Sequence, residues 1–199
     1  MSEFEDHVVK AYRGAWDKLV AEHCDLTLRH VNESVFRYFF IQELLRQNVQ
    51  LSIEDEWRRI DLLLKAPNCQ AAIEFKFYDK RPIVTLGGKV RYKGGSGPQN
   101  FGEFTKSLEQ LMSLETKTWY QQDKANVTER YFVLVGTKWQ EGGRSGDFSN
   151  HYYPPQVVKM PAGITMKPLA TTHEIVGNAE VFGWICSVAK QSIQQSHHS

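Results

Sequence analysis

The chain has 199 residues, of which 41% are hydrophobic, and its formal net charge is +1. This length and composition suit one domain with a sizeable apolar core, and the near-neutral charge excludes a uniformly polycationic nucleic-acid binder. The cysteines, Cys24, Cys69 and Cys186, are odd in number and widely spaced, which excludes a disulfide framework and a cysteine-ligated zinc site. The N-terminus is acidic, and no apolar run approaches the roughly 18 residues that span a membrane, so we expect a cytoplasmic protein with no membrane partner.

Two helices are predicted before the first strand. Apolar residues recur at helical spacing over residues 2–21, and Ser2 with Glu5 forms a capping box. A second helix is expected to begin after Asn32 as its N-cap and to run through residues 33–47, with phenylalanines and a leucine along its apolar stripe.

The remaining elements predict an α/β fold with a mixed central sheet flanked by helices. Two apolar strands flank the turn-like residues 67–70, and residues 79–100, rich in glycine and cations, are predicted mainly as a loop with room for a short hairpin. The run at 131–137 lacks polar alternation and so predicts a strand buried on both faces. Further predictions are a helix at 101–119, strand-like pieces at 156–160 and 163–167, and a last helix at 172–193.

Three charged residues interrupt the two apolar strands around residues 67–70. Because strand side chains alternate between faces, Glu74 and Lys76 lie on the opposite face from their aromatic neighbours. An antiparallel hairpin centred between Asn68 and Cys69 would set Asp61 opposite Lys76, so that all three charged side chains converge. A shift of one residue would separate them, so an odd sum of paired residue numbers is a requirement of this prediction.

Two carboxylates this close can share a hard divalent cation such as Mg²⁺, whose other ligands are waters and a substrate phosphate oxygen. A cation held there can polarise a phosphodiester and activate a water, while Lys76 stabilises developing charge or orients that water. A cross-strand salt bridge between Asp61 and Lys76 explains the same pattern, and a second Glu-x-Lys stands at residues 115–117. The residues alone therefore predict either a site of metal-dependent phosphodiester hydrolysis or a structural ion pair.

The arrangement resembles the PD-(D/E)XK nuclease superfamily, in which an acidic residue on one strand precedes a strand that bears Asp or Glu, any residue and Lys. Here the motif reads Ile60-Asp61 and then Glu74-Phe75-Lys76, with Ile60 in place of the family's proline. Glu33, in the first turn of the second predicted helix, matches the glutamate that the family often turns toward the site. The resemblance covers residues 32–137 and implies a restriction-endonuclease-like fold for a single domain of residues 1–199.

The resemblance implies a Mg²⁺-dependent endonuclease that accepts Mn²⁺ and cuts DNA in preference to RNA. Asp61, Glu74 and the backbone carbonyl of Phe75 would hold the metal, Lys76 would position or activate water, and Glu33 would assist. Double-strand cleavage by so small a site would favour a homodimer. The alternative is a catalytically inactive module of the same fold that binds nucleic acid or a partner protein.

Basic residues concentrate directly after this motif, with Asp79 as the one acidic residue among them. This local excess predicts contacts with a phosphate backbone, although an ordinary solvated loop explains it equally well. Arg59 could meet a phosphate or pair with Glu56, and Gln110 could turn toward the site or belong to a solvated helix face. The candidate nucleic-acid-binding residues are Arg59, Lys80, Arg81, Lys89, Arg91, Lys93 and Gln110.

Overall fold

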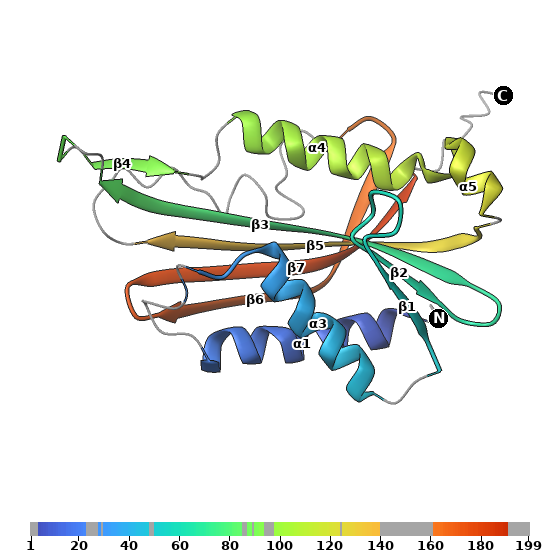
Figure 1. Cartoon of the computed structure of the whole chain (residues 1–199), viewed down its shortest axis with the longest axis horizontal. Coiled ribbons are helices and arrows are strands. Elements are labelled where there is room, and N and C mark those ends of the chain that lie inside the picture. The colour runs from blue at the N-terminus through green and yellow to red at the C-terminus, as the bar shows by residue number, and fades with distance from the viewer. Residues whose placement is uncertain are drawn as a thin grey trace, which may run out of the picture.

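The computed structural model is an α/β fold in which helices cover both faces of a twisted mixed sheet (Figure 1). It describes residues 4–22, 28, 30–47, 50–84, 87–88, 90–93, 98–123, 125–139 and 161–190. The strands are β1 (Ser52–Asp55), β2 (Leu62–Lys65), β3 (Gln70–Val84), β4 (Val90–Lys93), β5 (Val127–Trp139), β6 (Ile164–Val176) and β7 (Ala179–Lys190). The helices are α1 (Glu5–Glu22), α3 (Glu33–Arg46), α4 (Pro98–Met112), the 3-10 turn η1 (Leu114–Thr116) and α5 (Thr118–Gln122).

The strands follow the order β1-β2-β3-β5-β7-β6, and β4 pairs with the C-terminal part of β3. β3 and β5 are parallel and are joined by a crossover through α4, whereas the other pairs are antiparallel. The predicted mixed sheet is therefore confirmed. Among the described residues, no helix is both long and apolar enough to cross a membrane.

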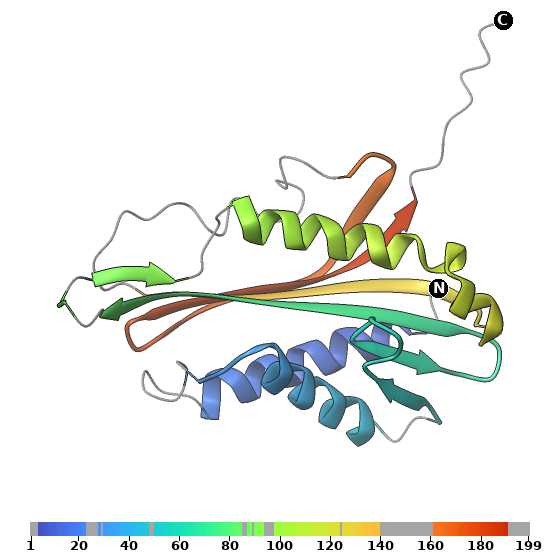
Figure 2. The ribbon, with the colours of Figure 1, turned by 45° about the horizontal axis from the view of Figure 1, so that its top comes forward.

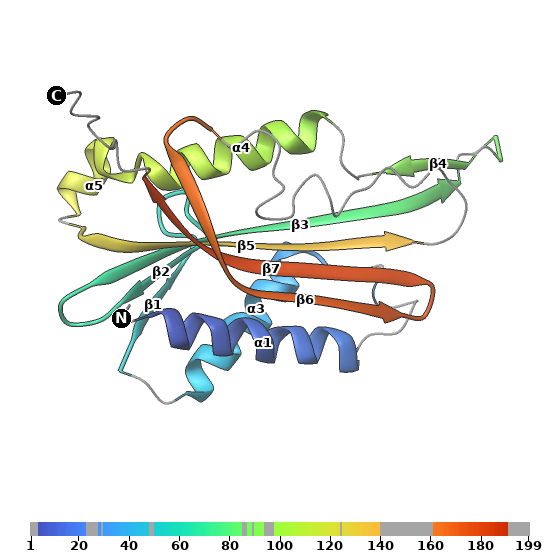
Figure 3. The same cartoon turned by 180° about the vertical axis from the view of Figure 1, so that it is seen from behind.

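Helices lie over both faces of the sheet (Figures 2 and 3). On each face an apolar cluster holds the layers together. α1 and α3 pack against one face, where Ile73 and Phe75 of β3 point, and Phe40 of α3 meets Phe75 edge to face. α4 packs against the other face, where Phe104 contacts the rings of Phe132 and Trp184. Strand alternation thus sends Phe75 and Glu74 of β3 to different layers.

The two predicted N-terminal helices are confirmed. The Asn32 side chain accepts a hydrogen bond from the backbone N–H of Val35 at 3.1 Å, so Asn32 is the N-cap of α3, as predicted. α1 runs close to its predicted bounds, while the capping residue Ser2 lies outside the described residues. The predicted helix at 101–119 begins earlier, at Pro98, and ends at Met112; η1 and α5 follow it.

The last predicted helix is wrong, because residues 172–176 belong to β6 and residues 179–190 form the antiparallel strand β7, while 191–193 lie outside the described residues. β7 lies between β5 and β6 with helices over both faces, so its side chains are buried regardless of alternation. Such a run has the same periodicity as a buried helix. The missed signal is Gly177-Asn178, a two-residue hairpin loop in which Gly177 has φ +57°.

Two further segments differ from prediction. The segment at 79–100 contains the short hairpin for which the prediction left room, formed by β4 and by β3 as far as Val84, but it is not mainly loop as predicted. The predicted strands at 131–137 and 163–167 are confirmed but are longer, as β5 and β6. The predicted strand at 156–160 lies outside the described residues.

Candidate active site at the end of the β2–β3 pairing

The β2–β3 hairpin has the predicted odd register, but its centre differs from the prediction. Lys65 pairs with Gln70 and Leu62 with Ile73, so the hairpin is centred between Pro67 and Asn68. Pro67 supplies the fixed φ that suits the first central position of a turn, which favours this register. The predicted pairing of Asp61 with Lys76 is therefore wrong. Continuing the observed register places Asp61 level with Glu74.

The candidate site lies where this pairing stops. β2 covers β3 only as far as Ile73, while β5 continues to pair with β3 on its other side. The Asp61 carboxylate substitutes for the missing strand, since its Oδ2 accepts a hydrogen bond from the Phe75 backbone N–H at 2.7 Å. Phe77, the next residue on this edge, offers a backbone hydrogen bond to Glu33. The open edge of β3 therefore gathers carboxylates from two different elements.

Glu74 is the most unusual residue of the site. It is only 5% exposed, and its Oε1 is 3.0 Å from the Lys76 Nζ. Its Oε2 is buried and accepts no hydrogen bond of normal geometry among the described residues, while the Ser107 side chain on α4 interacts with the same carboxylate. Burial and, to a lesser extent, the Asp61 carboxylate raise the pKa of Glu74 to about 7, against the lowering effect of Lys76 and of Ser107 on α4. An orphaned buried carboxylate oxygen indicates a site that is completed by a ligand or ion.

Lys76 is the cation at the centre of these carboxylates. Its Nζ donates to the Phe75 carbonyl at 2.8 Å and lies 3.7 Å from Glu33 Oε2, in addition to its contact with Glu74. Burial alone would lower the pKa of Lys76, but the carboxylates of Glu74, Glu33 and Asp61 outweigh it and the pKa is raised. Lys76 is thus an ammonium at neutral pH, in contact with two of the groups predicted to bind metal.

Glu33 lies beside the site, where the prediction put it. It occupies the first turn of α3, and burial raises its pKa, with Lys76 acting in the opposite direction. The helix reaches the site from the face of the sheet that holds α1, whereas Glu74 and Ser107 meet on the α4 side. The structure therefore brings together Asp61, Glu74, Lys76, Glu33 and the carbonyl of Phe75.

Arg37 of α3 belongs to this site and was missed by the sequence analysis. It is 7% exposed, and its guanidinium Nη1 donates to Asp61 Oδ1 at 2.7 Å. Its Nη2 and Nε contact Glu56 Oε1 at 3.0 Å and Asp55 Oδ1 at 3.1 Å. With one Asp61 oxygen held by Arg37 and the other by Phe75, this carboxylate has a fixed orientation. The available signal was that Arg37 follows Glu33 by four residues, which places both on one helix face.

The predicted nucleic-acid residues fall into two groups. Lys80 and Arg81 lie in β3, and Arg91 and Lys93 lie in β4, with Arg81 opposite Lys93; Lys89 lies outside the described residues. This hairpin extends at the end of the sheet opposite to β1 and β2 (Figure 1). Arg59 and Gln110 form the second group, in which the Gln110 Nε2 donates to the Arg59 carbonyl at 2.6 Å.

The oxygen atoms of Asp61, Glu74 and the Phe75 carbonyl are of the kind that Mg²⁺ and Mn²⁺ prefer as ligands. In the part of the chain that the structure describes, no cluster of three or more His, Cys, Asp or Glu side chains is arranged to hold a metal. Mg²⁺ needs no such cluster, because one or two carboxylates with waters and substrate oxygens suffice. Each carboxylate oxygen of Asp61 keeps a second lone pair beyond its hydrogen bond, and Glu74 Oε2 is unpartnered.

No protein-family model, curated protein or solved structure matches the chain. The residues and their geometry therefore carry the functional argument.

Proposed function

We propose that the protein is a Mg²⁺- or Mn²⁺-dependent nuclease of the PD-(D/E)XK type with a restriction-endonuclease-like fold, and that its substrate is DNA. The order of the elements along the chain supports the proposal, because it is the order that this family uses. The helix with Glu33 comes first, the β2–β3 hairpin follows, and α4 then crosses over to the parallel strand β5. The observation that carries it is the buried, orphaned Oε2 of Glu74 beside Asp61 and Lys76, at the open edge of β3.

Asp61, Glu74 and the Phe75 carbonyl would hold the cation. When bound, the cation would supply Lewis-acid polarisation of the phosphodiester and lower the pKa of a coordinated water. The protein's own part is to fix the ligands: the Phe75 N–H and Arg37 orient Asp61, while the pairing of β3 with β5 holds the backbone of Glu74. Preorganised ligands need no rearrangement as charge develops on the phosphate.

Lys76 acts by its charge. Because its pKa is raised, the side chain remains an ammonium and cannot accept a proton from water at neutral pH. It can donate hydrogen bonds to a phosphate oxygen whose negative charge grows in the transition state. Its contact with Glu74 is then exchanged for a contact with substrate, and Glu33 lies close enough to hold the ammonium nearby.

An inactive module that binds nucleic acid or a protein is the second candidate. The specific observation in its favour is that Lys76 and Arg37 already form ion pairs with Glu74 and Asp61. In that case the charges would be a structural network, and a divalent cation would have no role.

A cleavage assay separates the two candidates. The purified chain is incubated with supercoiled, linear duplex, single-stranded and branched DNA, and with RNA, in Mg²⁺, Mn²⁺ or EDTA. We expect cleavage of at least one DNA form in either metal and none in EDTA. The double variant Asp61→Asn/Glu74→Gln, purified in parallel, controls for contaminating nucleases. No cleavage of any DNA, or equal cleavage by the double variant, would refute the proposed nuclease.

A further inference from the structure

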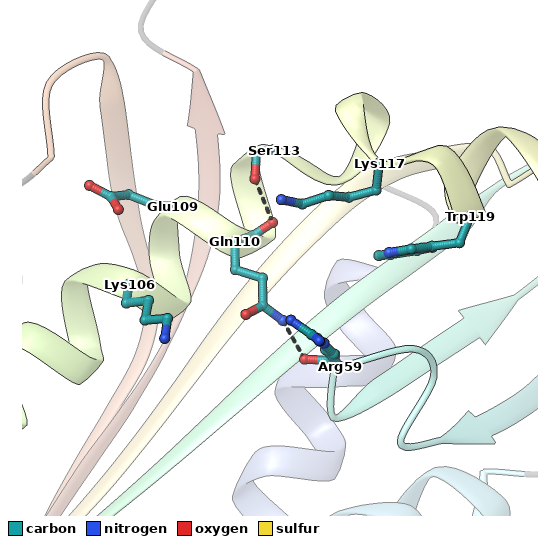
Figure 4. Close-up of a pocket in the computed structure, with 7 residues that line it drawn as sticks. All are labelled: Arg59, Lys106, Glu109, Gln110, Ser113, Lys117 and Trp119. Carbon is teal, nitrogen blue, oxygen red and sulfur yellow. Dashed lines mark hydrogen bonds between the residues drawn. The ribbon is translucent and has the colours of Figure 1, made fainter.

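A pocket lined mainly by polar and charged residues lies beside the candidate active site. Its volume is about 310 Å³, and residues from the β1–β2 turn, α4, the end of η1 and α5 contribute to it (Figure 4). Figure 4 shows Arg59, Lys117 and Trp119 directed toward Gln110, whereas Glu109 points away from it. The lining residues are Arg59, Lys106, Glu109, Gln110, Ser113, Lys117 and Trp119. Cations thus outnumber acids three to one in this lining.

The turn that presents Arg59 is strained and held from several sides. Glu56, Arg58 and Arg59 have φ of 52°, 60° and 127°, conformations that non-glycine residues rarely adopt. Arg58 forms a forked ion pair with Asp123, with distances of 3.1 Å and 3.0 Å, and Gln110 holds the Arg59 carbonyl at 2.6 Å. These contacts fix the backbone of Arg59 while its guanidinium remains exposed to bind a ligand.

The pocket and the candidate active site share two elements. Arg59 precedes Asp61 by two residues in the same turn, and the Glu56 N–H donates to the Asp61 carbonyl at 2.9 Å. Gln110 follows Ser107, the neighbour of Glu74, by three residues, or roughly one helical turn of 5.4 Å. A DNA strand that is bound with its scissile phosphate at Asp61 and Glu74 and runs along α4 would reach the pocket within a few nucleotides.

We propose that this pocket binds a backbone phosphate of the substrate strand next to the one that is cleaved, an inference that rests on the proposed function. Arg59 offers a planar fork that matches a phosphate bidentately, and Lys106 and Lys117 add ammonium donors. Trp119, held by an edge-to-face contact with Trp57 at 5.1 Å, forms a wall on which the adjoining base can stack. Gln110 is a positioning residue, since its amide holds the Arg59 backbone.

Oligonucleotide binding without cleavage tests the pocket. A fluorescein-labelled single-stranded 12-mer DNA is titrated in EDTA at several salt concentrations, with fluorescence anisotropy as the readout. The variant Arg59→Gln/Lys106→Gln/Lys117→Gln removes the three cations. The matched control, Lys10→Gln/Arg13→Gln/Lys167→Gln, removes the same charge from exposed positions on α1 and β6. Thermal unfolding of each variant confirms that it is folded.

We expect the pocket variant to bind at least about tenfold more weakly than the control, with a shallower salt dependence, because each lost phosphate contact removes about one released counterion. Equal affinities of the two variants would show that the pocket does not contact the strand. Competition by pyrophosphate is the second arm. If pyrophosphate binds as tightly as the 12-mer and depends equally on the three cations, the pocket serves free phosphates and the inference is wrong.

The binding assay and the cleavage assay fail independently. Cleavage that is retained with equal binding of the two variants would overturn the pocket and leave the nuclease. Weakened binding by the pocket variant in a protein that cuts no DNA would support the pocket as a nucleic-acid site and overturn the nuclease.

Discussion

Replacement of Lys76 by glutamine should lower the rate of DNA cleavage by about 10²–10³-fold, the usual cost of removing one preorganised donor to a developing oxyanion. Glutamine keeps a hydrogen-bond donor but removes the charge that Lys76 holds within reach of Glu74, Glu33 and the Phe75 carbonyl. The measurement is the single-turnover rate at saturating Mg²⁺, on whichever DNA form the wild type cuts.

The pH dependence of DNA cleavage by Lys76→Gln is an independent test of the same role. Lys76 lowers the pKa of Glu74, so its removal should raise that pKa further and move the rise of the pH–rate profile to higher pH. The control is Lys65→Gln in the same hairpin. The Lys65 Nζ is 2.5 Å from Glu54 Oε1, and this ion pair lies away from the site. A Lys76→Gln rate equal to that of Lys65→Gln would rule out a catalytic role for the ammonium.

Replacement of Arg37 by methionine should lower the free energy of unfolding by about 3–5 kcal/mol, the range for removing one member of a buried ion pair. Methionine fills similar volume but removes the direct ion pair of Asp61, which keeps its hydrogen bond from the Phe75 N–H and only the more distant charge of Lys76. Urea denaturation of the variant measures the loss. Arg46→Met is the matched control on the same helix, because its side chain is 65% exposed and its pair with Glu43 is worth less than about 1 kcal/mol.

A double-mutant cycle identifies the cause of this loss. If the cost arises from an uncompensated Asp61 charge, Asp61→Asn in the Arg37→Met background should restore part of the stability. Additive losses in the two variants would contradict the coupling that the 2.7 Å contact implies. Equal stability of Arg37→Met and Arg46→Met would show that Arg37 does not hold the site together.

Much of the candidate site was predictable, because the face on which a strand side chain lies depends on whether its position is odd or even. It does not depend on which residues pair across the hairpin. The alternation of β3 placed Glu74 and Lys76 on the face opposite to Phe75 whatever the turn geometry, and the structure has this division. Alternation alone does not determine which residues of β2 and β3 pair. The choice between turns centred one residue apart depends on the local fit of Pro67 and Asn68.

Arg37 shows what alternation and motif spacing do not reveal. Its neighbours in α3 are the phenylalanines of the apolar stripe, so its helical spacing from Glu33 is the one local indication of a functional residue there. Its role depends on the packing of α3 against the β1–β2 turn, which brings Asp55, Glu56 and Asp61 together around one guanidinium. Contacts between elements far apart in sequence require the tertiary fold.

The misassigned C-terminal segment has a similar origin. Val181, Phe182, Trp184 and Ile185 are all buried because β7 is an inner strand with helices on both faces. Burial of this kind removes the two-residue alternation that distinguishes a strand from a helix. The Gly-Asn pair at the hairpin was the local signal, and the apolar periodicity outweighed it in the prediction.

Calorimetric titration of Mn²⁺ into the substrate-free protein tests most directly whether Asp61 and Glu74 share a cation. We predict saturable binding that is absent in folded Asp61→Asn and Glu74→Gln variants. Because Glu74 has a pKa of about 7 and must be ionised to bind, wild-type affinity should rise about tenfold from pH 6 to pH 8 as the proton is lost. A cation shared by Asp61 and Glu74 is ruled out if the wild type does not bind Mn²⁺, or if both variants bind it as the wild type does.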